Sequence, residues 1–158
     1  MFPADADTVF GMLTDEQYVT RKATAMGALE HDVSVTALEG GGARIRLERT
    51  LPAMVPDFVR PLVGETIRVV QTEDWGPVRP DGGRTGRMTA TISAAPVSLS
   101  GELTLEPNDG SSVHRIEAEV RARVPFVGGK IEKAIGEVIL LAARKEEQVG
   151  SAWLAEHR

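Results

Sequence analysis

The chain has 158 residues, no cysteine, and 18 Lys and Arg against 23 Asp and Glu, for a formal net charge of -5. A chain of this length fits one domain that buries roughly 68–70% of its unfolded surface, enough for a core and a modest internal pocket. The absence of cysteine excludes disulfides, thiolate nucleophiles and Cys-ligated zinc. The scattered basic residues and the negative charge make nucleic acid and anionic membrane surfaces poor partners.

Other sequence signals narrow the function further. The longest apolar run, from Val138 to Ala143, is far shorter than the eighteen or more residues of a membrane span. The first residues lack the basic start and apolar core of a secretory signal, so we expect a cytoplasmic location. The three histidines have no metal-binding spacing and no phosphate loop is present, so we expect no metal and no cofactor.

Two short helices are predicted at the start of the chain. Asp5 or Asp7 can cap a helix that runs to Leu13, because a carboxylate accepts the free amide hydrogens of the first turn. Thr14 and Gln17 form a capping box for a second helix that fades near Gly27.

From Leu29 onward the pattern alternates between apolar and polar residues, which predicts about six strands. Because the strands alternate rather than being uniformly apolar, we expect an antiparallel sheet with one solvated face. The proline-rich segment from Pro52 to Pro61 cannot be a central strand and is expected to form a packed loop or one helical turn. The predicted strands are Leu29–Ala37, Ala43–Leu51, Glu65–Trp75, Arg84–Ser93, Val97–Glu106 and Ser112–Val124.

The last fifth of the chain, from Val124 to His157, predicts one amphipathic helix of about 28 residues and roughly 42 Å. Gly136 and Gly150 each weaken it by about 1 kcal/mol relative to alanine, so we expect tertiary packing to hold it. Leu140 points away from the apolar stripe. The predicted stripe contains Ile131, Ala134, Ile135, Val138, Ala142, Val149, Ala152 and Trp153.

These features together carry a resemblance. The PADADTVF start, the predicted meander and the long helix entered through VPFVGGKIEK resemble the START-like, or Bet v 1-like, helix-grip superfamily (SRPBCC). Within it, FPADADTVFGMLTDEQYV, PFVGGKIEK and the late WLAE are similar to the DUF2505 family of uncharacterised actinobacterial proteins. The resemblance covers essentially the whole chain, so we expect a single START-like domain over residues 1–158.

The resemblance implies an α+β fold in which a curved antiparallel sheet wraps around the C-terminal helix. It also implies a hollow between them that is open to an apolar small molecule. Superfamily members bind lipids, sterols, polyketides or plant hormones, and some are cyclases or hydrolases. The fold normally begins with a strand, whereas only Met1 and Phe2 precede Pro3 here. A missing strand would leave an exposed sheet edge, which invites a homodimer.

Four polar residues fall on the predicted inward face of the sheet: His31, Arg49, Gln71 and His114. Either they orient the polar end of a ligand, or they lie at wet strand ends and reach the rim. A guanidinium on an apolar face needs a carboxylate partner, here Glu73 or Glu117, or an anionic ligand. Apolar residues predicted to line the hollow are Ile45, Leu47, Ile67, Val69, Trp75, Ile131, Ile135, Val138 and Ala142.

Several of these residues also have a structural interpretation. Trp75 and Trp153 can fill the core instead of forming a pocket wall. Lys145 interrupts the helix stripe, where it either faces the pocket mouth or lies in solvent. Met12, Met26, Met54 and Met88 are adaptable core fillers that could also line a cavity.

Three functions remain open from the sequence. The first is a binding protein for a hydrophobic, in one version anionic, small molecule such as a lipid or polyketide, which requires a closed apolar cavity above about 300 Å³. The second is a cyclase or hydrolase that uses His31 or His114, which requires an imidazole inside the cavity with a hydrogen-bonded carboxylate. The third is a protein-interaction module that uses the exposed sheet edge.

Overall fold

A computed structural model describes residues 1–55, 57–58, 60–93 and 95–157 of the chain. Helix α1 (Ala6–Leu13) begins where the Asp5 carboxylate accepts a hydrogen bond from the Thr8 amide at 2.9 Å, as predicted. Helix α2 (Glu16–Ala25) is capped by Asp15, whose carboxylate accepts hydrogen bonds from the Gln17 and Tyr18 amides. The predicted Thr14 capping box is therefore wrong: only two residues separate the helices, and the Thr14 hydroxyl instead donates to the Phe10 carbonyl at the end of α1.

Six strands form one antiparallel sheet in the order β1-β2-β3-β4-β5-β6, which confirms the predicted meander. Phe2 pairs with Ser112 at the start of the edge strand β6. The proline-rich connection contains the single turn α3 (Arg60–Val63), and its Pro56 and Val59 lie outside the described residues. The strands are β1 (Glu30–Ala37), β2 (Ala43–Pro52), β3 (Thr66–Trp75), β4 (Arg84–Ile92), β5 (Val97–Asn108) and β6 (Ser111–Ala122).

The register places the inward-facing residues of the six strands in rows across the sheet. Because side chains alternate between the two faces, each row continues from strand to strand on one side. One row consists of Val35, Ile45, Glu73, Met88, Gly101 and Ala118, and the next of Val33, Leu47, Gln71, Ala90, Leu99 and Val120.

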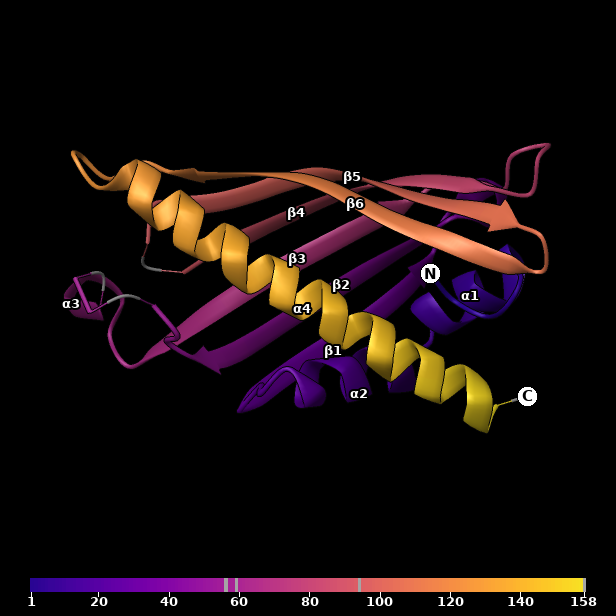
Figure 1. Ribbon diagram of the computed structural model, residues 1–158, viewed down its shortest axis with the longest axis horizontal. Coiled ribbons are helices and arrows are strands. Elements are labelled where there is room, and N and C mark those ends of the chain that lie inside the picture. Colours follow the sequence, from indigo (N-terminus) through magenta and orange to yellow (C-terminus); the bar gives the residue numbers. More distant parts are fainter. Residues whose placement is uncertain (56, 59, 94, 158) are drawn as a thin grey trace.

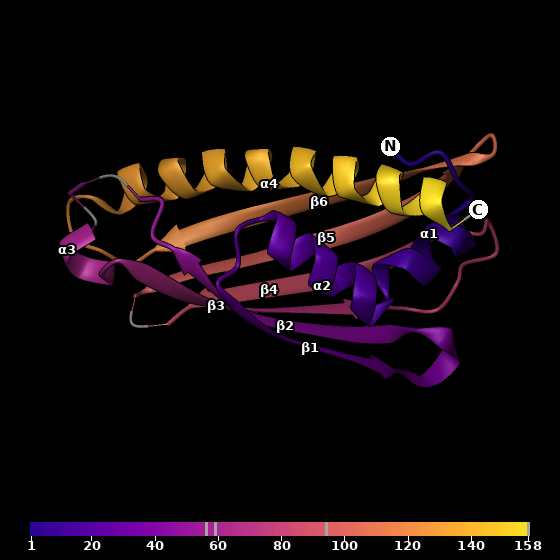
Figure 2. The same cartoon turned by 90° about the horizontal axis from the view of Figure 1, so that it is seen from below.

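Helix α4 (Gly128–Glu156) covers this inner face. Its 29 residues cross the sheet diagonally from one end to the other (Figure 1). Seen from below, α4 lies along the sheet, with α1 and α2 beside its C-terminal half (Figure 2). The expected arrangement of a curved sheet around a long helix is confirmed.

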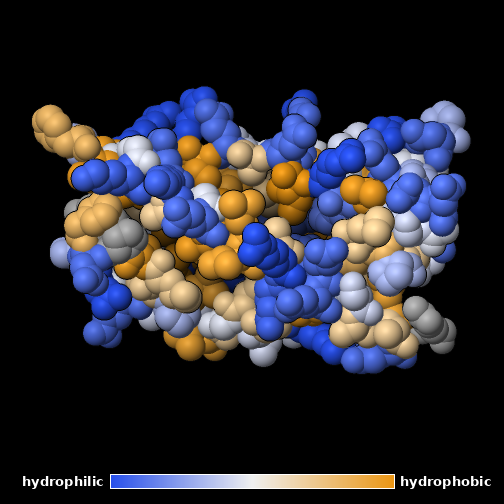
Figure 3. Space-filling model, in the orientation of Figure 1, coloured by the Kyte–Doolittle hydropathy of each residue, from blue (hydrophilic) through white to orange (hydrophobic). Residues whose placement is uncertain are grey.

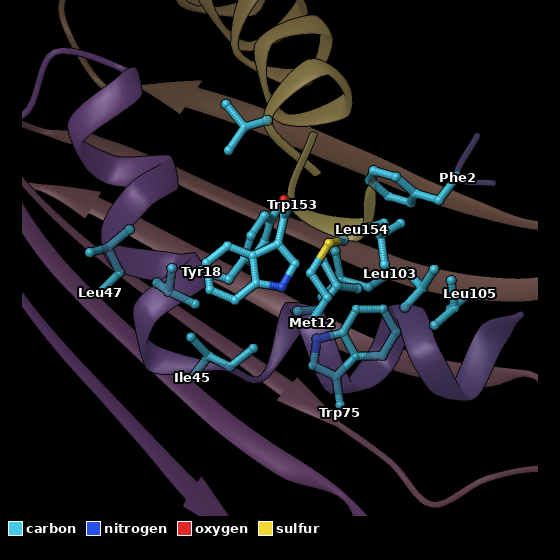
Figure 4. Packing of buried hydrophobic residues seen from close by; sticks show 14 of the residues in the cluster. Phe2, Met12, Tyr18, Ile45, Leu47, Trp75, Leu103, Leu105, Trp153 and Leu154 are labelled. Atoms are coloured by element: carbon cyan, nitrogen blue, oxygen red, sulfur yellow. The ribbon is translucent and has the colours of Figure 1, made fainter. Parts of the chain in front are cut away.

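The core has two parts of unequal size. The large cluster lies under the C-terminal half of α4, where Tyr18, Trp75 and Trp153 pack with residues of α1, α2 and the sheet (Figure 4). Its two tryptophans are 1% and 8% exposed, so both fill the core. The small cluster lies under the N-terminal half and consists of Val97, Ala122 and Ile131, with half-buried side chains around them.

Candidate functional site

Side chains between the two clusters are more exposed than those within them. Gln71, Ala90 and Ala142 are only half-buried there, and Val138 of α4 is 44% exposed although it was predicted to face the sheet. In Figure 3 the surface is hollowed beside α4, with apolar atoms around the recess. We call this part of the molecule the central region.

A chain of polar side chains crosses the inner face at the edge of the central region. Arg49 donates from Nη2 to Oε1 of Gln71 at 3.3 Å, and Gln71 donates from Nε2 to Oε1 of Glu73 at 2.7 Å. The indole of Trp75 donates from Nε1 to the other Glu73 oxygen at 3.2 Å. Glu73 is thus the buried carboxylate predicted for Arg49, reached through Gln71, whereas Glu117 is exposed.

The helices contribute an ion pair to the same region. Lys22 of α2 lies with its Nζ 3.3 Å from Oε1 of Glu146 on α4, and the two side chains are only 8% and 13% exposed. Burial alone lowers the pKa of Lys22, but the charges of Glu146 and Glu73 outweigh it and raise that pKa. Burial raises the pKa of Glu146, yet Lys22 and His114 bring it below its ordinary value. Both groups are therefore held in their charged forms.

Three buried polar side chains from three different elements lie near Glu73 and Glu146, whose charges act on all three. In the part of the chain that the structure describes, Oη of Tyr18, Nε of Arg49 and Nε2 of His114 have no hydrogen-bond partner. Tyr18 comes from α2, Arg49 from β2 and His114 from β6. The His114 ring packs against the Trp75 ring at a centroid distance of 5.6 Å, which brings it close to Glu73.

Burial sets the protonation of these three groups. It raises the pKa of Tyr18, with Glu146 and Glu73 adding to the shift, so the phenol remains a hydroxyl donor. Burial also lowers the pKa of His114 below 6.5, although Glu146 and Glu73 oppose that shift, so the imidazole is neutral at pH 7. Burial lowers the pKa of Arg49 against the same two carboxylates. The charges of Lys22 and Arg49 thus balance those of Glu73 and Glu146.

The residues predicted to line the hollow occupy three environments. Ile45, Leu47 and Trp75 are in the large cluster, and Ile131 is in the small one. His31 is exposed on the edge strand β1, and Val138 is also exposed. Ile135 packs against the small cluster as well. The remaining predicted residues are buried or half-buried: Arg49, Ile67, Val69, Gln71, His114 and Ala142.

Sequence reasoning missed Tyr18, Lys22 and Glu146. The helix pattern contained a signal for the last two, because Glu146 lies between Ala142 and Val149 on the apolar stripe. The neighbouring Lys145, which we expected either at the pocket mouth or in solvent, is exposed. Lys22 follows Tyr18 by one helical turn, so a buried face of α2 includes both.

A measurable depression lies elsewhere, on the outer face of the sheet. It has a volume of about 490 Å³ and is lined by residues of β4, β5 and β6, most of them charged or polar. It is not the closed apolar cavity expected under α4, which stays a prediction. The lining residues of the depression are Arg87, Ser100, Gly101, Glu102, Glu117, Ala118 and Glu119.

Among the described residues, α4 and the shorter helices are not long and apolar enough to cross a membrane.

A curved antiparallel sheet that grips a long C-terminal helix, with two short helices near the start, defines the helix-grip class of α+β proteins. The particular family follows from the sequence, because residues 1–154 match the profile described as "Protein of unknown function (DUF2505)". The chain belongs to this family.

Individual relatives and solved structures are also similar to this chain. Uncharacterized proteins of Mycobacterium tuberculosis and Mycobacterium bovis are 30% identical over 105 residues, which is 65% of this chain and 60% of theirs. The match thus spans less than two thirds of these relatives. A conserved protein from Geobacillus kaustophilus has the same fold, with a TM-score of 0.56, 14% identity and coverage of 98% of this chain and 91% of its own. The Zhui aromatase/cyclase from Streptomyces sp. R1128 also has a TM-score of 0.56, with 16% identity and coverage of 96% and 87%.

Proposed function

We propose that this chain binds a hydrophobic small molecule between the sheet and α4, with the polar end of the ligand against Tyr18, Arg49 and His114. The observation that carries the proposal is that three of the six buried side-chain polar atoms without partners in the described part of the chain belong to residues near Glu73 and Glu146. An unpaired buried donor or acceptor costs about 1–3 kcal/mol. A ligand that pairs with these atoms recovers that free energy, and the apolar side chains around them hold its body.

The chemistry of these atoms indicates the polar end of the ligand. The Tyr18 hydroxyl and the Arg49 Nε both donate, and the neutral His114 imidazole either donates or accepts, depending on its tautomer. They therefore suit an acceptor such as a carbonyl oxygen. Because Lys22 and Arg49 are already balanced by Glu73 and Glu146, a carboxylate would add an uncompensated negative charge. A neutral carbonyl compound fits better than the anionic ligand that the sequence left open.

Two adjacent alanines of α4 test the location of the site. Ala142 is half-buried toward the central region, whereas Ala143 is exposed. We expect Ala142→Trp to weaken binding of the apolar fluorophore N-phenyl-1-naphthylamine to delipidated protein by about tenfold or more, because the indole fills the space. Ala143→Trp should bind like the wild type. Equal binding by the two variants would show that the probe occupies another part of the molecule.

The polar end is tested with a methyl ketone, a fatty acid and an alkane of equal chain length. Tyr18→Phe removes only the hydroxyl, so it should weaken binding of the ketone by about three- to tenfold and leave binding of the alkane unchanged. Unchanged ketone binding contradicts the assigned orientation. Native mass spectrometry of protein from its own host then gives the mass of a co-purifying ligand.

An enzymatic alternative has one observation in its favour. His114 is a buried, neutral imidazole whose Nε2 has no partner in the described part of the chain, which suits a general base. His31, the other histidine proposed from the sequence, is exposed and does not meet that requirement. If the alternative holds, His114→Gln should abolish turnover of a poly-β-carbonyl substrate and retain its binding. The expected homodimer and cytoplasmic location remain predictions.

A further inference from the structure

Large apolar side chains are exposed at the end of the molecule where α4 begins. Met54 is 76% exposed, Phe58 is 47% exposed and Phe126 is 105% exposed. Phe126 also has a backbone φ of 68°, a left-handed conformation that bulky residues rarely adopt. Phe126 thus combines a solvent-exposed aromatic ring with a strained backbone. Strained residues of this kind cluster at functional sites, which suggests that Phe126 contacts a partner outside the chain.

These side chains belong to one surface. Val55 and Val63 of the β2–β3 connection and Val124 and Val127 of the β6–α4 connection all pack against the small cluster. Figures 1 and 2 both show α3 and the turn into α4 at the same end of the molecule, far from the marked N and C ends. We call the surface formed by Met54, Phe58 and Phe126 the apolar tip.

The charge around the apolar tip differs from that of the rest of the chain. Residues 53–65 and 121–133 contain five basic and three acidic residues, whereas the remainder contains thirteen basic and twenty acidic ones. The net charge of -5 thus hides a positive end on an acidic protein. Four exposed basic residues flank the exposed phenylalanines: Arg60, Arg123, Lys130 and Lys133.

We infer that the apolar tip docks on the surface of a bilayer that contains anionic lipid. Aromatic rings insert at the boundary between headgroups and acyl chains, and neighbouring lysines and arginines are attracted to anionic headgroups. The apolar tip has an exposed phenylalanine on each of the two connections, with exposed basic residues next to them in the chain. Insertion into the low-dielectric part of the bilayer would also remove the Phe126 ring from water. Packing within the chain does not do this, because the ring is exposed. This inference rests on the outer surface and is independent of the ligand site proposed above.

Vesicle flotation of the full chain tests the inference. Wild-type protein should float with vesicles of phosphatidylcholine mixed with an equal amount of phosphatidylglycerol, and only weakly with phosphatidylcholine alone. Phe58→Ser combined with Phe126→Ser should reduce the bound fraction by about tenfold. Leu140→Ser combined with Leu141→Ser is the matched control, because these leucines are 65% and 61% exposed away from the tip, and it should bind like the wild type.

The charge contribution has its own matched pair on α4. Lys130→Glu combined with Lys133→Glu should reduce binding to anionic vesicles by about tenfold or more, since each basic residue near the surface adds several-fold to the affinity. Arg144→Glu combined with Lys145→Glu makes the same change in net charge farther along the helix and should have little effect. Added salt should weaken wild-type binding.

Three outcomes would overturn the inference. The first is wild-type protein that does not float with anionic vesicles, and the second is an equal loss of binding in the tip and control variants. The third is a stable dimer in light scattering that dissociates in the phenylalanine variant while vesicle binding is unchanged, which would assign the tip to a second copy of the chain. Circular dichroism of each variant confirms that it is folded.

Discussion

The C-terminal half of α4 packs into the large cluster, whereas its N-terminal half is held by the small cluster and by a hydrogen bond from the Ala122 amide to Glu132. The Trp153 ring packs edge-on against the Tyr18 ring, with 5.7 Å between their centroids. It also stacks on the His157 ring, with 4.0 Å between centroids. Arg21 of α2 forms two hydrogen bonds to Glu156, at 2.6 and 2.9 Å. Toward the other end, Val138, Leu140 and Leu141 are exposed.

This difference indicates how one helix can serve both packing and binding. The packed half supplies stability and fixes the position of the helix over the sheet. The other half retains apolar side chains, such as Val138, that its own core does not bury, which leaves surface for a ligand. Local opening should accordingly begin in the N-terminal half, where fewer apolar contacts hold the helix.

The largest effect is expected from Trp153→Ala. Removing this ring opens a cavity in the large cluster and should lower the free energy of unfolding by about 4 kcal/mol. Ile131→Ala in the small cluster, also buried, should lower it by about 2 kcal/mol because its looser surroundings relax. Urea unfolding measures both. If Ile131→Ala lowers the free energy of unfolding more than Trp153→Ala does, the C-terminal half of α4 is not the more tightly packed half.

Lys22→Met should have the next largest effect. It leaves Glu146 with little solvent and without its ion-pair partner, which should lower the free energy of unfolding by about 3 kcal/mol. Adding Glu146→Leu should restore most of that loss, because it removes the uncompensated charge. The exposed Lys145→Met is the control. A double variant no more stable than Lys22→Met would mean that the charge of Glu146 is not the cause.

Two glycines of α4 should respond to alanine in opposite directions. A Cβ on Gly150 would lie 2.5 Å from the buried Phe2 ring and 3.1 Å from Cε of Met12, so Gly150→Ala should destabilise by about 1–3 kcal/mol. A Cβ on Gly136 meets no described atom within 4 Å. Gly136→Ala should therefore stabilise by up to about 1 kcal/mol through helix propensity alone. The same sign for both in thermal unfolding would contradict the difference in packing.

Most of the fold was predictable from the sequence because local patterns determine it. Alternation located all six strands, and the apolar stripe located α4 within a few residues of its ends. Met54 was expected as a possible core filler and is 76% exposed, although its neighbours Ala53 and Val55 are buried and half-buried. The stripe also placed Val138 inward, since periodicity gives a direction but not whether an opposing side chain fills the space.

The candidate site was only partly predictable. Strand alternation found Arg49, Gln71 and His114, because all three belong to one sheet whose face can be counted. Tyr18, Lys22 and Glu146 come from two helices whose docking angles depend on tertiary packing, so no local pattern places them beside the sheet. Charge pairing across elements is therefore the part that the sequence did not show.

The smallest effect, and the one that tests where the packed half ends, is the pH dependence caused by His114. Burial holds the pKa of His114 below 6.5 in the folded protein, against the opposing charges of Glu146 and Glu73. As the pH falls, the unfolded chain therefore binds a proton at His114 before the folded protein does. The free energy of unfolding is thus unaffected by His114 above about pH 6.5 and decreases as the pH drops below that value. His114→Gln should make the urea unfolding midpoint less dependent on pH between neutral and mildly acidic conditions. If the pH dependence persists in His114→Gln, the imidazole is solvated, and the central region is open to water as far as β6.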